Sequence, residues 1–328
     1  MSYKSGTDWA GRVDSKSDKS AFRWHQVIMP VDVSDIEAQK QDADSVNFCF
    51  LGFCCDEGVT RNLGRPGAKN GPASIRKEMA NWPANFNPKV TLYDAGDVWC
   101  DGNQLEEAQE ELATVVSKLT QNGYFPILLG GGHEIALGHF KGLLNIDLDK
   151  TPAIINFDAH LDLRPVNDKG SSGTMFNQIY QICQLQNRHY SYLCIGPQTY
   201  ANTPSLFAKA DEFGAEYILA KDVVRENLQN VSELIEAFVK KQDSIYLTVC
   251  TDVLSAAHAP GVSAVQPFGL DPEIVLELIK QIIRSGKVCS LDIAEVSPRF
   301  DSDNRTAKLM AVYIYSIINT LVEMQLNK

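Results

Sequence analysis

The stretch AIINFDAHLDLR, residues 153–164, joins a short apolar run to a cluster of charged residues. The run Ala153–Phe157 is apolar at successive positions, which is typical of a strand buried on both faces of a parallel sheet. Runs of the same kind lie on either side of it in the sequence, and we predict strands at all of them. They are Val46–Leu51, Val90–Tyr93, Phe125–Leu129, Tyr192–Ile195, Glu216–Leu219, Ile245–Val249 and Val288–Ile293.

Amphipathic stretches separate the predicted strands. In Leu105–Leu119 apolar residues recur three and four positions apart, as on one face of a helix. The same pattern is found in Val231–Val239, Pro272–Ile283 and Arg305–Leu326. Strands that alternate with helices indicate a parallel sheet with helices on both faces. No linker or break in composition interrupts residues 46–328, so we predict one α/β domain there, with an N-terminal arm or peripheral helices over residues 1–45.

The composition excludes several classes of protein. The 328 residues include 30 Lys and Arg against 41 Asp and Glu, a net charge of −11, which argues against a nucleic-acid partner. We find no run of 18 uncharged apolar residues and expect no membrane-spanning helix. The polar N-terminus has no apolar core of a secretory signal. Eight cysteines without a CxxC motif are expected to be reduced thiols in a cytoplasmic protein.

Residues able to do chemistry follow four of the predicted strands. In a parallel α/β sheet the active site lies beyond the carboxyl ends of the strands, so these positions are expected to come together. The segments are GGGHE (130–134), DAHLD (158–162), Cys250-Thr251-Asp252 and Ala294-Glu295-Val296. GGGHE lacks the Lys-Ser/Thr of a phosphate-binding loop and the spacing of GxGxxG, so we discount a nucleotide site.

The segment DAHLD predicts a metal site. Asp158, His160 and Asp162 alternate, so in an extended segment their side chains would project to one side. Two carboxylates and an imidazole suit a divalent cation, and His133 and Asp252 offer the same ligand types at two other strand ends. A metal-bound water would then be the nucleophile. Hydrogen-bonded or surface histidines are expected at the remaining positions, His25, His139, His189 and His258.

These motifs, together with GVTRNLGRPGA (58–68), DAGD (94–97) and DIAEV (292–296), resemble the ureohydrolase superfamily of arginase, agmatinase and formimidoylglutamase. The match runs from about residue 48 to the C-terminus. The resemblance implies a three-layer α/β/α fold around a mainly parallel sheet of about eight strands. It also implies a homo-oligomer that hydrolyses C–N bonds in guanidino or formimino groups of a small-molecule substrate, using two manganese ions bridged by hydroxide.

The resemblance assigns roles position by position. One ion would be held by His133, Asp158, Asp162 and residue 250, and the other by Asp158, His160, residue 250 and Asp252. Glu295 matches the acidic residue that pairs with the cationic amidinium of the substrate.

Residue 250 is a cysteine where the family usually has a bridging Asp. A thiolate is a softer ligand and suits manganese less well than zinc or iron. Three outcomes are open: Cys250 ligates, it stands aside while five ligands hold a weaker cluster, or one metal is lost. We expect a retained but weakened site.

Two further positions differ from arginases. Gly132 stands where they carry an Asp, and Phe176 stands where they carry a histidine thought to shuttle protons. The segment SSGTMF (171–176) together with GGGHE is similar to formimidoylglutamases instead. That similarity implies hydrolysis of N-formimidoyl-L-glutamate to L-glutamate and formamide, a step of histidine degradation.

This substrate carries two carboxylates, and the sequence offers cations for them. Arg164 directly follows the metal motif and can clamp a carboxylate with two hydrogen bonds. Arg61 and Arg65 are candidates for the second carboxylate, and Thr174 for a hydroxyl contact, although each has an equally plausible structural role in its loop. Two alternatives remain open: another ureohydrolase, such as an agmatinase or guanidinobutyrase, or a non-catalytic relative with an impaired metal site.

Overall fold

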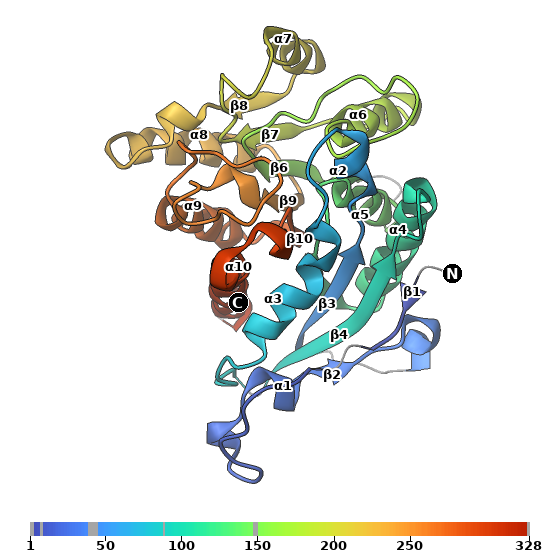
Figure 1. Ribbon diagram of the computed structural model, residues 1–328, viewed down its shortest axis with the longest axis vertical. Helices are drawn as coiled ribbons and strands as arrows, with labels where there is room; N and C mark the ends of the chain where they lie inside the picture. Colours follow the sequence, from blue (N-terminus) through green and yellow to red (C-terminus); the bar gives the residue numbers. More distant parts are fainter. Residues whose placement is uncertain (1–2, 7–8, 39–44, 88, 147–149, 327–328) are drawn as a thin grey trace.

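The computed structural model describes residues 3–6, 9–38, 45–87, 89–146 and 150–326. Within these ranges a ten-stranded sheet forms the centre of the molecule (Figure 1), in the order β1-β4-β3-β5-β10-β9-β6-β7-β8 with β2 also paired to β4. Eight of its strands are the predicted ones, and all neighbours among them are parallel. They are β3 (Val46–Cys54), β4 (Val90–Trp99), β5 (Tyr124–Leu129), β6 (Ala153–Phe157), β7 (Tyr192–Ile195), β8 (Glu216–Ile218), β9 (Ile245–Cys250) and β10 (Val288–Ala294).

The N-terminal segment lies along the β4 edge of the sheet. Strand β1 (Tyr3–Lys4) pairs antiparallel and β2 (Met29–Pro30) parallel with β4. Helix α1 (Trp24–Val27) lies beside them, and its Trp24 is fully buried, with its ring 6.0 Å from that of Phe50. The domain boundary at residue 45 stays a prediction.

Helices cover both faces of the sheet, which confirms the three-layer prediction. One apolar core lies under α3 (Gly71–Met79), α8 (Leu228–Lys240), α9 (Pro272–Arg284) and α10 (Arg305–Leu326). The other lies under α4 (Leu105–Gln121), α5 (Ile135–Leu144), α6 (Met175–Leu185) and α7 (Pro204–Phe213). The short helix α2 (Glu57–Arg61) follows β3 at the carboxyl ends of the strands.

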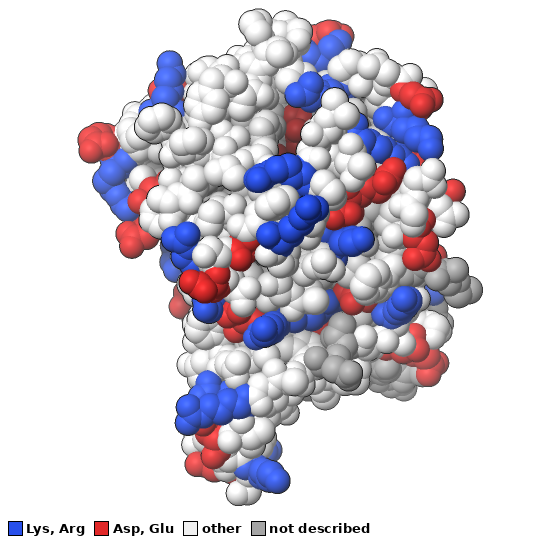
Figure 2. Space-filling view, in the orientation of Figure 1, with Lys and Arg blue, Asp and Glu red and all other residues white. Residues whose placement is uncertain are grey.

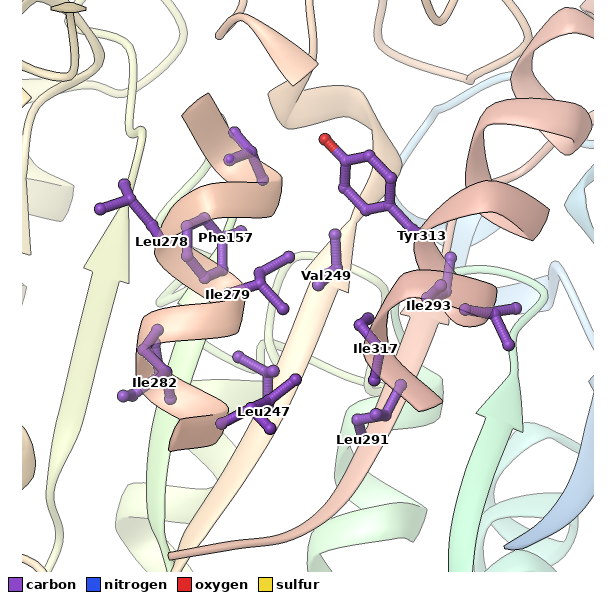
Figure 3. Close-up of a cluster of buried hydrophobic side chains, with 14 of the residues drawn as sticks. Phe157, Leu247, Val249, Leu278, Ile279, Ile282, Leu291, Ile293, Tyr313 and Ile317 are labelled. Carbon is purple, nitrogen blue, oxygen red and sulfur yellow. The ribbon is translucent and has the colours of Figure 1, made fainter. Parts of the chain in front are cut away.

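The core under α9 and α10 anchors the strands that carry the predicted site (Figure 3). Ile279 of α9 and Ile317 of α10 pack with Leu247 and Val249 of β9 and with Ile293 of β10, and all five side chains are fully buried. Burying each such side chain is worth about 1.5–3 kcal/mol. The carboxyl ends of β9 and β10 are therefore held in fixed positions.

Helix α10 is the part of the structure that bears on the expectation of no membrane-spanning helix. The span Ser302–Met324 is long and apolar enough, by length and composition, to cross a membrane. Half of it is buried inside the protein, where Met310, Ile314 and Ile318 contribute to the core. The helix also contacts α3 and α9. This is the environment of a core helix.

Candidate metal centre

His133, Asp158 and Asp162 meet at the carboxyl edge of the sheet. The Nδ1 atom of His133 lies 2.9 Å from Oδ2 of Asp158 and 3.3 Å from Oδ2 of Asp162. The glycines before His133 allow this placement, because a Cβ at Gly131 would lie 1.8 Å from the carbonyl oxygen of Cys55. The ligand atoms of His133, Asp158 and Cys250 all lie within 4.8 Å of one another.

A second group of ligands shares Asp158 with the first. The Nδ1 atom of His160 lies 3.3 Å from Oδ1 of Asp158 and 3.3 Å from Oδ2 of Asp252. The ligand atoms of these three residues also lie within 4.8 Å of one another. Asp158 thus offers one carboxylate oxygen to each group. The structure brings all six predicted metal ligands together, in the arrangement expected for two metal ions.

The unsatisfied atoms of the site fit a bound cation. Nδ1 of His133 and Oδ1 of Asp252 are buried and have no hydrogen-bond partner among the described residues. His133 Nδ1 is close to two carboxylates, yet it forms a hydrogen bond with neither. Buried polar atoms left without partners are destabilising, and a divalent cation between these nitrogen and oxygen atoms would satisfy them. The residues present therefore fit a two-metal centre.

Burial and the neighbouring carboxylates act in opposite directions on the pKa values of the two histidines. Burial lowers the pKa of His133, but Asp158 and Asp162 overcome this effect and raise it well above its ordinary value. Asp158 and Asp252 do the same to the pKa of His160. Because a metal needs the unprotonated nitrogen, metal binding is expected to release protons.

The ligands converge for a different reason from the predicted one. Strand β6 ends at Phe157, and the residues after it form bends instead of continuing the strand. The backbone NH of His160 donates to Oδ1 of Asp158 at 2.8 Å, and Asp162 has a φ of +49°. Asp252 likewise lies in a single 3-10 turn, Thr251–Val253, and not on an extension of β9. The prediction of one extended segment was wrong, although its side chains do meet.

Cys250 lies at the end of β9, inside the site. Its side chain is buried, and it belongs to the group with His133 and Asp158 but not to the group with His160 and Asp252. Burial, reinforced by Asp158 and Asp252, raises the pKa of the thiol well above its ordinary value. Burial and the two carboxylates therefore both favour the neutral thiol over the thiolate.

Glu295 presents a carboxylate oxygen to the same cavity. Its Oε1 accepts a hydrogen bond from the backbone NH of His133 at 3.0 Å, while Oε2 is buried and has no hydrogen-bond partner in the described part of the chain. The residue is 4% exposed, so it is not a surface glutamate. Its φ of +68° is a strained conformation for a non-glycine residue, of the kind that gathers at functional sites. Burial, then Glu134 and Asp252, raise its pKa well above the ordinary value.

The cavity above these residues is small and has an arginine at its side. It measures about 220 Å³ and is bordered by Arg164, Asn62 and Asn202, as well as by Glu295 and every predicted metal ligand except Asp158. Figure 2 shows acidic side chains recessed in a hollow on this face of the molecule, with basic ones near its edge. Arg164 is exposed, and its guanidinium makes no hydrogen bond or ion pair within the described ranges. Glycine at 173 leaves room for it, because a Cβ there would lie 2.9 Å from Cδ of Arg164.

The contacts of Arg61 favour the structural role that the sequence left open beside a carboxylate contact. Its guanidinium donates to Glu57, to both oxygens of Glu106 and to the carbonyls of Asn103 and Gly170. These five hydrogen bonds use all five of its N–H donors. None is left for a substrate carboxylate.

Arg65 and Thr174 are also engaged by the protein. Arg65 donates to the carbonyls of Val262 and Ser263, and its guanidinium lies 4.1 Å from the ring centre of Phe300. Thr174 precedes α6, and its hydroxyl is shared between the backbone of Ser171 in its own loop and the side chain of Gln178 in α6. Neither residue borders the cavity that contains the metal ligands. For Arg61, Arg65 and Thr174 the structural alternative is the one that the geometry supports.

Two residues of the site region occupy places that the sequence did not reveal. Phe176 is fully buried behind His133, at 5.6 Å between ring centres, so it cannot act from within the cavity. Glu134 is fully buried, and burial raises its pKa to about 7. Its Oε1 accepts from the NH of Gly58 at 2.9 Å, and its Oε2 would lie 2.0 Å from a Cβ at Gly132. The Glu134 carboxyl thus fills the space that a larger residue at 132 would need.

The comparisons with known proteins agree with this geometry. The family model of the arginase family matches residues 46–319. A formimidoylglutamase of Clostridium tetani is 50% identical over 320 residues, covering 96% of this chain and 94% of the relative. One of Lysinibacillus sphaericus is 40% identical over 316 residues, with 96% of each chain covered.

Solved structures share the fold. A crystal structure of Trypanosoma cruzi formiminoglutamase with Mn2+2 superposes with a TM-score of 0.76 at 24% identity, covering 89% of this chain and 98% of that one. The formimidoylglutamase of Bacillus subtilis gives a TM-score of 0.75 at 22% identity, with 94% and 96% covered. The matched family model, the near full-length relatives and the clustered ligands lead to one conclusion. This chain belongs to the arginase family.

Proposed function

We propose that this protein hydrolyses N-formimidoyl-L-glutamate to L-glutamate and formamide, a step of histidine degradation. The observation that carries the proposal is Arg164, an arginine whose guanidinium has no partner among the residues that the structure describes, beside a buried acidic centre. A substrate with a cationic formimino group at one end and carboxylates at the other matches this pairing of charges. Relatives at 40–50% identity over nearly the whole chain carry the name formimidoylglutamase, which supports the same substrate.

Different residues bind the two ends of the substrate. Two divalent cations, when bound, lower the pKa of a water and supply a nucleophile at neutral pH. The unpartnered Oε2 of Glu295 accepts from the formimino nitrogen and holds the cationic group in place. Arg164 binds a carboxylate and so fixes the distance of the reacting carbon from the metal ligands.

The cofactor, compartment and assembly are part of the proposal. We propose manganese, since the three carboxylates and two imidazoles among the six ligands are mainly hard ligands, and the similar fold of Trypanosoma cruzi formiminoglutamase has a crystal structure with Mn2+2. We propose that the protein acts in the cytoplasm, where its eight free thiols remain reduced. A homo-oligomer stays a prediction that light scattering tests.

The two competing functions fit the site less well. An agmatinase binds a cation without a carboxylate and gains nothing from Arg164. A non-catalytic relative would have no need for six converging ligands with buried, unsatisfied atoms. A product assay separates all three: we expect formamide and glutamate from formimidoylglutamate, and no urea from arginine, agmatine or guanidinobutyrate. Urea from a guanidino substrate at a comparable rate, or no product from any substrate in the presence of manganese, would overturn the proposal.

Arg164→Ala is expected to lower kcat/KM for formimidoylglutamate by roughly ten- to a hundredfold. Removing a charge-assisted contact typically costs about 1.5–3 kcal/mol, and each 1.36 kcal/mol is a factor of ten. The matched control is Arg225→Ala, since Arg225 is exposed and pairs with Glu277 outside the cavity. Steady-state kinetics should show no change in the control. The role would be refuted if Arg164→Ala kept the parental ratio of kcat/KM for formimidoylglutamate to kcat/KM for an analogue lacking one carboxylate.

Cys250→Asp is expected to raise manganese affinity or occupancy without loss of the fold. A carboxylate is a harder ligand than a thiol and can bridge two ions with its two oxygens. Metal content by mass spectrometry, with Cys289→Asp as a cysteine control outside the site, measures the effect. Two tightly held manganese ions per chain in the parent, unchanged by Cys250→Asp, would show that Cys250 does not weaken the site.

A further inference from the structure

His133 is held from the side opposite the metal ligands. Its Nδ1 faces Asp158 and Asp162, and its Nε2 lies 2.9 Å from the hydroxyl oxygen of Thr248. Nδ1 must carry a lone pair to bind a metal. In the neutral ring that requires the proton to sit on Nε2.

The hydroxyl of Thr248 determines where that proton lies. A threonine hydroxyl has one hydrogen, and here it donates to Oδ1 of Asp292 at 2.5 Å. The Thr248 oxygen is therefore left to accept from Nε2–H of His133. An acceptor at this position favours the tautomer whose Nδ1 is free for the metal.

Asp292 is in turn held by donors deep in the protein. Its Oδ2 accepts from the hydroxyl of Tyr246 and lies 2.6 Å from Nδ1 of His139. Ser290 lies 2.7 Å from the other nitrogen of His139 and donates to the carbonyl of Pro126 at 2.9 Å. A carboxylate is an acceptor only, so these donors keep both of its oxygens occupied and its orientation fixed.

The register of the sheet builds this network. Strands β9 and β10 pair Ser290 with Tyr246, Asp292 with Thr248, and Ala294 with Cys250. The polar residues thus occupy alternate positions, and the pair nearest the site includes a predicted metal ligand. Tyr246, Thr248, Asp292, Ser290 and His139 are all fully buried. Burying so many polar groups is unfavourable unless each is satisfied, and here the hydrogen bonds of the network, which ends at His133, satisfy them.

We propose that Thr248 and Asp292, supported by His139 and Tyr246, are positioning residues of the metal centre that set the tautomer and ring orientation of His133. Neither Thr248 nor Asp292 borders the cavity described above. The inference rests on the proposed metal centre and deepens it. It also gives His139 a role, where the sequence indicated only a hydrogen-bonded or surface histidine.

Metal affinity of the purified variants tests the proposal without any activity assay. Thr248→Val keeps the shape of the side chain and removes the hydroxyl, and it should weaken manganese binding roughly ten- to a hundredfold, the usual range for such partners of a ligand. Thr248→Ser restores the hydroxyl and should bind within about threefold of the parent. Thr320→Val removes a buried hydroxyl bonded to Ser316 in α10, away from the centre, and should bind as the parent does. Titration against a chelating dye measures all four proteins.

A spectroscopic measurement on the parent protein adds a test that does not depend on how well the variants fold. In the zinc-loaded, ¹⁵N-labelled parent, His133 should show an exchange-protected, low-field Nε2–H proton, and Asp292→Asn should shift or lose this signal. The amide of Asn can donate to Thr248, whose own proton is then turned towards Nε2 of His133. Parental manganese affinity in Thr248→Val, or a zinc-loaded parent without a protected Nε2–H, would overturn this inference and leave the proposed function standing. A parent that binds no divalent metal would instead overturn the proposed function.

Discussion

Asp158→Ala is expected to reduce hydrolysis to the background rate. Asp158 is the residue that both ligand groups share, with Oδ1 towards His160 and Oδ2 towards His133. Its loss removes a ligand from both metal positions at once, so neither should be filled at micromolar metal. Metal analysis and formamide release measure this together.

A matched control separates this effect from unfolding. Asp222→Ala removes a carboxylate from a 3-10 turn outside the cavity and should retain two metals and parental turnover. Thermal melting should show both variants folded. Parental turnover in Asp158→Ala would contradict its assignment as the shared ligand.

Glu295→Gln is expected to lower kcat/KM by between roughly 30-fold and several-thousand-fold. Losing one partner of a buried, hydrogen-bonded charge pair costs about 2–5 kcal/mol, and here the other partner is the cationic formimino group. Gln can still accept from the NH of His133, as Glu295 does at 3.0 Å, so the loop should keep its shape. Metal content should stay parental, since Glu295 belongs to neither ligand group. Steady-state kinetics and metal analysis on one preparation measure both effects. An unchanged kcat/KM would show that Glu295 takes no part in the reaction.

The sequence predicted the fold because buried parallel strands and amphipathic helices leave strong patterns. Strands β6 and β7 have the predicted bounds, and α4 begins where the three- and four-residue spacing begins. Helix α5 was missed because it is buried almost all round and shows no polar face. Helix α3 was missed because it starts with Gly71 and Pro72, residues that usually mark turns.

The site was predictable where residue type alone decides the chemistry. Residue type at the strand ends predicted five candidate ligands, His133, Asp158, His160, Asp162 and Asp252, and the parallel topology brings those ends together. The candidate roles of Cys250 and Glu295 came from the family resemblance. The roles of Arg61 and Arg65 could not be predicted, because a guanidinium binds a protein carbonyl as readily as a substrate carboxylate. The pairing of Thr248 with Asp292 could not be predicted for another reason. The two residues lie in different strands, and only the register of β9 with β10 places them side by side.

The central claim is that this chain hydrolyses formimidoylglutamate at a two-metal centre. Titrating metal-free protein with manganese, and measuring formamide release from formimidoylglutamate after each addition, tests it most directly. The rate should start at background, rise with added metal and level off at two equivalents per chain. Full activity of the metal-stripped protein in excess chelator would contradict the claim.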